Sequence, residues 1–390
     1  MHKKSNNRNR EEKNKSHTVC YLCGSIRAVE ILNKDSIIMW TNIGDDSTEK
    51  KIKYKCVIKQ CIDCGHVYQP VSNRLNSMLN KMYLSKRAQA STPLGKGNWG
   101  KERAKSLFDS WDLKNYKSAV EIGCADGYIL RCLKNKGFTD LVGIDPSIEK
   151  TQKIGGIQYL KAFACPQTML SHKYDLIFAN NVFEHIININ AVIKFCRDNL
   201  EAKGELFFLV PNAERQLNEG DPALFLHQHT HYFTGSTIRY LLAKNGFTVK
   251  SLVMTKDVFR VKARINEVLD CAPKVIYYKA YMVKLEKVLN KIQKFIREKN
   301  IIIHGVSSSL NNILGWLRGN FDFTLVDNDN TKHGKVFFRK QVYPMSVLNL
   351  NNYNGVFIVP APFYKAIRKA YVLSGFKGAY ESTSFSRHKK

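Results

Sequence analysis

Two pairs of cysteines have the spacing of a metal site. Cys20 and Cys23 form one CxxC pair, and Cys61 and Cys64 form another. A glycine follows each pair, and its freedom to adopt positive φ lets the chain turn so that backbone N–H groups face the thiolates. Four thiolates leave no open position on a tetrahedral ion. We therefore expect one structural Zn²⁺ here. The smaller alternative, a redox dithiol, lacks the βαβ pattern of thioredoxin-like proteins.

A short strand that runs into a glycine-bearing turn indicates a nucleotide-binding site. Residues 120–128 read Val-Glu-Ile-Gly-Cys-Ala-Asp-Gly-Tyr, and a helix is expected over 129–136. Gly123 and Gly127 lack the side chains that would collide with a ligand close to the backbone. Glu121 distinguishes this turn from a dinucleotide fingerprint, because a pyrophosphate disfavours a neighbouring acid.

The next strand supplies the second half of this pattern. Residues 141–144 form that strand, and Asp145 at its tip can accept hydrogen bonds from two ribose hydroxyls. Over about 118–255, the chain resembles the class I S-adenosylmethionine-dependent methyltransferases, whose E/DxGxGxG turn has alanine in the middle glycine place here. The resemblance implies S-adenosylmethionine as methyl donor. It also implies a cofactor-binding set comprising Glu121, Gly123, Ala125, Gly127, Asp145 and Asn180.

The elements that position these residues divide the chain into six regions. We expect a disordered basic tail (1–17), a zinc-binding module (18–70), a helical connector (71–117), the S-adenosylmethionine-binding methyltransferase domain (118–258), a helical linker (259–300) and a C-terminal Rossmann-like domain (301–380). Within the linker, apolar spacing predicts one long amphipathic helix over 272–300. The fold class is therefore α/β: a Rossmann-like methyltransferase domain with a small zinc module before it and a second Rossmann-like domain after it.

Length and composition exclude several classes of protein. The 390 residues are 44% hydrophobic and 24% charged, as expected for several domains with real cores. No apolar run approaches the roughly 20 residues of a membrane helix, so we expect no membrane span. No apolar stretch follows the basic N-terminus, so we expect no secretory signal peptide. Together with ten cysteines in no disulfide-scaffold pattern, this predicts a reducing, cytoplasmic location.

The charge balance is compatible with two interpretations of the protein surface. The chain has 61 basic and 33 acidic residues, a net charge of +28. An excess of this size favours anionic partners such as nucleic acid or phosphorylated substrates. Lysines occur in nearly every segment, however, which is equally typical of a generally basic surface.

The segment after the expected fourth strand of the methyltransferase domain bears on the methyl acceptor. Amino-methylating nucleic-acid enzymes carry Asn/Asp-Pro-Pro-aromatic there, whereas residues 180–183 read Asn-Asn-Val-Phe. The Pro-Cys nucleophile of cytosine-C5 enzymes is also missing, because Cys165 precedes its proline. Nucleic acid is therefore a possible but less favoured partner. A catalytically inactive S-adenosylmethionine-binding module is a third hypothesis.

The order of the three folded units resembles the sugar C-methyltransferases of deoxysugar biosynthesis across nearly the whole chain. In the last unit the similar segments are 301–311, 323–335 and 355–360. The resemblance implies a nucleotide-linked sugar or glycan intermediate as acceptor. The last unit would then close over a nucleotide sugar, or else serve packing or dimerisation.

Two histidines are the candidate catalytic residues. The sugar C-methyltransferases carry a Tyr-x-Glu-His stretch where this chain has Leu-His-Gln-His over 226–229, so of its named residues only the last, His229, is kept. His185 takes the place of another histidine of that family. Because imidazole titrates near neutral pH, we expect His229 to be the general base, with His185 as the nearest rival. With the tyrosine and the glutamate replaced, C-methylation and O-methylation are both open.

Overall fold

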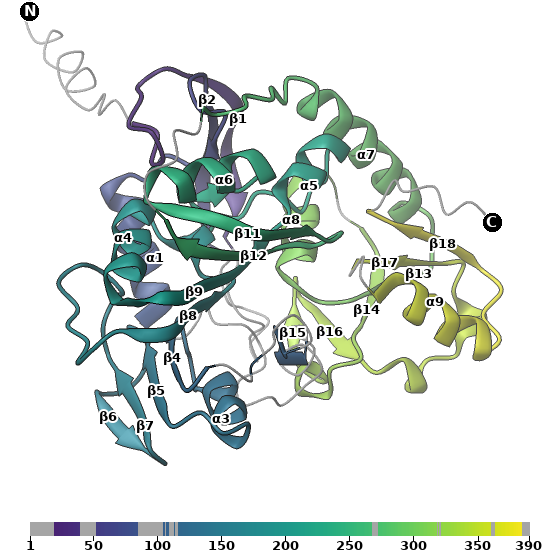
Figure 1. Ribbon diagram of the computed structural model, residues 1–390. Helices are drawn as coiled ribbons and strands as arrows, with labels where there is room; N and C mark the ends of the chain where they lie inside the picture. Colours follow the sequence, from purple (N-terminus) through teal and green to yellow (C-terminus); the bar gives the residue numbers. More distant parts are fainter. Residues whose placement is uncertain are drawn as a thin grey trace, which may run out of the picture.

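The computed structural model describes residues 19–39, 52–84, 104–105, 107–108, 113, 116–266, 272–317, 319, 321–359 and 363–383. The basic tail predicted over 1–17 lies outside the described residues. Two large sheets occupy opposite sides of the molecule in Figure 1, and helix α8 lies between them. No helix in the described ranges is long and apolar enough to cross a membrane.

A small antiparallel sheet contains the N-terminal cysteine module. Its strands are β1 (Ala28–Ile38), β2 (Lys53–Cys61) and β3 (Val67–Tyr68), and its fourth strand is β10 (His231–Tyr232), more than 160 residues later. The register pairs His231 with Tyr68 and Tyr232 with Val67. The module is therefore joined to the methyltransferase domain by backbone pairing. The connector begins with helix α1 (Asn73–Leu84), as predicted.

The methyltransferase domain has an eight-stranded sheet in the order β11-β12-β9-β8-β4-β5-β7-β6. In chain order its strands are β4 (Ser118–Ile122), β5 (Asp140–Ile144), β6 (Gln152–Ile154), β7 (Ile157–Leu160), β8 (Tyr174–Asn180), β9 (Leu200–Pro211), β11 (Phe247–Met254) and β12 (Val258–Ile265). The central strands from β7 to β9 run parallel and are mostly buried, as expected for a sheet covered on both faces.

The helices of this domain follow the glycine turn and the later strands. They are α3 (Tyr128–Asn135), α4 (Ile189–Asn199), α5 (Ala213–Glu219) and α6 (Gly235–Lys244), with the short 3₁₀ helix η5 (Phe183–His185) after β8. The predicted helix over 129–136 and strand over 141–144 are thus confirmed to within one residue.

The predicted helical linker over 259–300 is wrong in its first part. Residues 258–265 form β12, which lies antiparallel between β9 and β11 and so belongs to the methyltransferase sheet. The long helix is also shorter than predicted, since α7 spans Tyr281–Ile296. Before it, Gln60 donates to the carbonyl of Ile276 (2.6 Å) and accepts from the amide of Tyr278 (3.2 Å). These bonds hold the chain outside a helix at this point, in place of the helical hydrogen bonds that the pattern predicted.

The C-terminal domain is a second Rossmann-like unit, as predicted. Its sheet has the order β15-β16-β14-β13-β17-β18, parallel except at β15. Its elements are β13 (Ile301–His304), α8 (Ser308–Trp316), β14 (Phe323–Val326), η6 (Asn330–Lys332), β15 (Val336–Phe337), β16 (Lys340–Tyr343), η7 (Met345–Val347), η8 (Leu350–Asn352), β17 (Gly355–Ile358), α9 (Tyr364–Leu373) and β18 (Ala379–Ser382).

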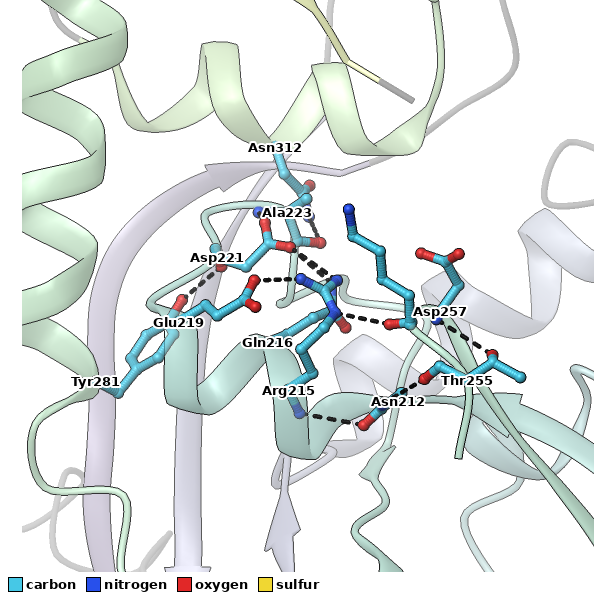
Figure 2. Close-up of polar contacts among 11 residues, drawn as sticks. Asn212, Arg215, Gln216, Glu219, Asp221, Ala223, Thr255, Asp257, Tyr281 and Asn312 are labelled. Carbon is cyan, nitrogen blue, oxygen red and sulfur yellow. Dashed lines mark hydrogen bonds and ion pairs between the residues drawn. The ribbon is translucent and has the colours of Figure 1, made fainter. Parts of the chain in front are cut away.

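A polar network joins α5, α7 and α8 where the domains meet (Figure 2). Arg215 of α5 forms ion pairs with Glu219 and, at 3.6 Å, with Asp221. The backbone carbonyl of Asp221 accepts a hydrogen bond from the hydroxyl of Tyr281 on α7 (3.0 Å). Asn312 of α8 donates to two carbonyls of the same loop, at 2.7 and 3.3 Å. The C-terminal domain is thus fixed to the methyltransferase domain by buried, directional bonds.

We predict that His304 makes the C-terminal domain sensitive to acid. Burial lowers the pKa of His304 from its usual value to about 4. The unfolded chain therefore binds more protons below pH 6.5, and stability is lost as the pH falls toward 4. Between pH 7 and pH 5 this loss is about 2 kcal/mol. Urea unfolding at the two pH values should show a smaller acid loss in His304→Gln than in the wild type. Equal losses would contradict the prediction.

Candidate donor, acceptor and cysteine sites

The four cysteines of the two CxxC pairs converge. The Sγ atoms of Cys20 and Cys64 are 3.5 Å apart, and so are those of Cys23 and Cys61. All four sulfurs lie within 4.8 Å of one another. Zn–S bonds of about 2.3 Å place tetrahedral sulfurs about 3.8 Å apart, so this arrangement fits a tetrahedral ion. Contact with Cys20 lowers the pKa of Cys61 and raises that of Cys64.

The two cysteine turns are built alike. In each, the glycine N–H donates to the carbonyl of the first cysteine, over 2.8 Å at Gly24 and 3.1 Å at Gly65. Both glycines have positive φ, at 82° and 73°, as predicted. The first turn is anchored to the methyltransferase domain, because the Lys244 ammonium donates to the carbonyl of Leu22 (2.7 Å). The cluster therefore lies against the methyltransferase domain.

The glycine turn after β4 has the predicted backbone but different close neighbours. Gly123 and Gly127 have φ of 75° and 73°, and Ala125 is also left-handed at 48°. A Cβ atom on Gly123 would lie 2.3 Å from a methyl group of Val182, and one on Gly127 would lie 2.3 Å from the hydroxyl of Tyr159. In this structure, the expected close approach at the two glycines is therefore made by protein side chains.

Asp145 holds the turn that it follows. Its Oδ2 accepts from the amide of Ala125 (2.8 Å), and its Oδ1 accepts from the amide and the hydroxyl of Ser147 (2.8 and 2.6 Å). Oδ1 thus has two donors already, whereas Oδ2 has only one and keeps a lone pair with which the group could accept from a ribose hydroxyl. Asn180, the other predicted cofactor residue, ends β8 on the neighbouring strand of the sheet.

The donor turn is locally acidic. Glu121 is only 3% exposed, and its Oε2 atom has no hydrogen-bond partner among the described residues. Burial raises the pKa of Glu121 well above its usual value, and the charges of Asp126 and Asp145 add to this effect. A cationic ligand would stabilise the ionised form of Glu121, because its positive charge would compensate the buried negative charge. S-adenosylmethionine carries a sulfonium and an ammonium group, and the turn fits such a ligand.

The structure brings His185 and His229 together. Their ring centroids are 4.8 Å apart in an edge-to-face arrangement. His185 Nδ1 lies 2.8 Å from the carbonyl of Gln228, which links the two loops. Burial and the neighbouring His185 lower the pKa of His229 well below its usual value, so its imidazole is neutral at neutral pH. A neutral imidazole can accept a proton.

Two residues of this cluster escaped the sequence reasoning. Tyr83, near the end of α1, places its hydroxyl 3.1 Å from His185 Nδ1, and Glu184 places a carboxylate oxygen 3.8 Å from His185 Nε2. No local motif marks Tyr83, whereas an acid directly before a histidine was a signal for Glu184. The other histidines of the loop have backbone partners: His227 contacts the carbonyl of Tyr54 (3.2 Å), and His231 that of Ile186 (2.7 Å).

The glycine turn and the histidine pair are connected by a short stretch of chain. Val182 packs into the space left by Gly123, and η5 begins at the next residue and ends at His185. The histidine pair therefore lies one short helix away from the glycine turn. This proximity suits transfer of a group between two bound ligands.

Comparison with known proteins identifies the class. Residues 96–252 match the family model described as a methyltransferase domain. Together with the Rossmann-like sheet, this match makes the segment a class I S-adenosylmethionine-dependent methyltransferase domain. The protein is an S-adenosylmethionine-dependent methyltransferase.

Solved structures are similar to the chain at low sequence identity. An S-adenosylmethionine-dependent methyltransferase from Mesorhizobium loti is 14% identical, with a TM-score of 0.35, over 41% of this chain and 96% of its own. One from Clostridium acetobutylicum is 12% identical, with a TM-score of 0.36, over 50% and 100%. The PH0226 protein from Pyrococcus horikoshii is 14% identical, with a TM-score of 0.38, over 45% and 94%. No curated protein matches the chain.

We predict that Asp145→Ala weakens S-adenosylmethionine binding by at least about tenfold, the loss of one charge-assisted hydrogen bond. Titration calorimetry measures this affinity directly. Asp175→Ala is the matched control, because Asp175 also accepts backbone amides, those of Lys117 (2.8 Å) and Ser118 (2.9 Å), but at the start of β4. Its affinity should stay near that of the wild type. Unchanged binding in Asp145→Ala would remove Asp145 from the donor site.

Proposed function

We propose that this enzyme transfers a methyl group from S-adenosylmethionine to a nucleotide-linked sugar or a related glycan intermediate. The observation that carries the proposal is the pair His185–His229 beside the donor turn, since a sugar hydroxyl or carbon acid must lose a proton to be methylated. The unit order, with a cysteine module before the methyltransferase domain and a parallel sheet after it, supports a sugar acceptor through its resemblance to the sugar C-methyltransferases.

The proposed chemistry needs alignment and proton removal from the protein. Glu121 and Asp145 would hold S-adenosylmethionine, and the donor and the acceptor would have to be aligned by the protein for transfer. His229 takes the acceptor proton on its neutral imidazole. His185 and Tyr83 are fixed beside it through the carbonyl of Gln228, to which the Tyr83 hydroxyl donates over 3.4 Å. Bound S-adenosylmethionine would supply the methyl group: the acceptor atom would bond to the methyl carbon as its bond to sulfur breaks, with S-adenosylhomocysteine as the leaving group.

One observation favours a sugar over a nucleobase as acceptor. An extruded base is commonly stacked on aromatic or apolar side chains. The aromatic residue after β8 is Phe183, which is fully buried. Its ring packs against that of Phe208, with the ring centroids 5.0 Å apart. It is therefore not exposed to stack on a base.

The experiment that tests the proposal is a transfer assay with labelled S-adenosylmethionine. The acceptors are a panel of nucleotide-linked sugars, with both keto and hydroxyl forms, set against total tRNA and rRNA. Label in the sugar fraction supports the proposal. Label in RNA would replace it with the nucleic-acid hypothesis, and donor binding with no transfer to any acceptor would favour an inactive module.

We predict that His229→Asn lowers kcat on the true acceptor by about 10²–10⁴-fold, the usual contribution of a general base. Affinity for S-adenosylmethionine should remain unchanged. His172→Asn is the control, because His172 pairs with Asp140 (2.7 Å), outside this cluster. Near-normal turnover in His229→Asn would assign this histidine to structure, and a selective loss in His185→Asn would move the base there.

The cysteine cluster is proposed to hold one structural zinc ion. After dialysis against metal-free buffer, elemental analysis should give about one zinc per chain, the stoichiometry of a four-thiolate site. Cys61→Ser should lose this zinc and lower the melting temperature. Cys56→Ser should keep it, because Cys56 lies outside the cluster and burial raises its pKa to about 12. Full zinc content in Cys61→Ser would refute the assignment.

A further inference from the structure

A second group of metal-ligand atoms lies on the acceptor side of the site. One donor atom each from Glu184, His185 and His229 lie within 4.8 Å of one another. Two imidazoles and one carboxylate form a set that binds divalent transition-metal ions and leaves coordination positions open. This set shares no residue with the four cysteines.

The tautomer of His185 directs a lone pair toward this group. Nδ1 lies 2.8 Å from the carbonyl of Gln228, which can only accept, so Nδ1 carries the hydrogen. Nε2 then presents its lone pair, in the neutral ring, to the Glu184 carboxylate oxygen 3.8 Å away. Two acceptor atoms that face each other repel unless a proton, a water molecule or a metal cation lies between them. Metal-ligating histidines typically donate their other N–H to a carbonyl in this way.

The carboxylate is also held in place. Glu184 is 1% exposed, and its Oε1 accepts from the side-chain amide of Asn181 (3.1 Å). Its backbone carbonyl accepts from the amide of Thr230 (2.7 Å), which ties η5 to the loop that carries His229. Metal ligands are commonly oriented by such outer hydrogen bonds. Metal–nitrogen bonds of about 2.1 Å bring donors about 3.4 Å apart, so the pair at 3.8 Å needs only a small inward rotation.

We propose that Glu184, His185 and His229 form a second metal site, which takes a divalent transition-metal ion such as Zn²⁺ or Co²⁺. Such an ion occupies the lone pair with which His229 would accept a proton. Metal binding here and proton abstraction by His229 are therefore mutually exclusive, so the site makes the enzyme open to inhibition by these ions. Binding itself does not depend on the proposed acceptor.

The test is metal stoichiometry of the full chain after equilibrium dialysis against Zn²⁺. The wild type should bind about two ions, one at the four thiolates and one at the second site. His229→Ala and His185→Ala should each bind about one. Co²⁺ distinguishes the two positions, because only the thiolate site gives intense sulfur-to-metal absorption. The second equivalent should add only weak visible bands.

The control variant is His172→Ala, which removes a histidine paired with a single carboxylate, Asp140. It should retain both ions. Affinity for S-adenosylmethionine reports whether each variant is folded. One ion in the wild type, or two ions in folded His229→Ala, would overturn the second site. Neither result would bear on methyl transfer, which is measured separately in metal-free buffer.

Discussion

The two-residue pairing of β3 with β10 is the contact on which the geometry of the histidine pair depends. It joins a cysteine module at one end of the chain to the loop that carries His229. Gln69, directly after β3, reinforces the pairing: its amide donates to the carbonyl of Thr230 (3.0 Å) and its side chain to that of His227 (2.8 Å). The loop that carries His229 belongs to no helix or long strand, so its geometry is fixed mainly by these bonds to β3 and Gln69 of the cysteine module.

The same connection continues to η5, which carries His185. His66, just after the second cysteine pair, contacts His231 over 2.9 Å, and the far nitrogen of His231 contacts the carbonyl of Ile186 over 2.7 Å. The cysteine turn, β10 and η5 thus form one bonded series. Loss of the four-cysteine cluster would act on the segments that carry His185 and His229, although none of its cysteines belongs to the histidine cluster. A closed thiolate site can therefore matter to catalysis without any chemistry of its own.

The local motifs were predictable from sequence, and the contacts between distant segments were not. The cysteine turns and the Glu121 turn are set by glycines and by residues a few positions apart, so their geometry follows from local backbone rules. Tyr83 meets His185 only because α1 packs beside η5, about a hundred residues later in the chain. The start of α7 was missed for the same reason. Its amphipathic pattern extends N-terminal to residue 281. There, however, the hydrogen bonds of Gln60 to Ile276 and Tyr278 replace helical hydrogen bonds, so the helix does not form in spite of the local helix propensity.

The two Rossmann-like units share one hydrogen-bond arrangement at their first turn, and they differ in the charge beside it. Asp145 accepts the amide of Ala125 across the first turn (2.8 Å), and Asp327 accepts that of Val306 across the second (2.7 Å). In the second unit the Lys332 ammonium lies 2.9 Å from the same carboxylate oxygen and neutralises it. Among the described residues, no such cation pairs with Asp145. A chain of net charge +28 would repel a cationic ligand. The electrostatic attraction of such a ligand would therefore be greatest at an acidic turn whose carboxylate is not already paired with a lysine.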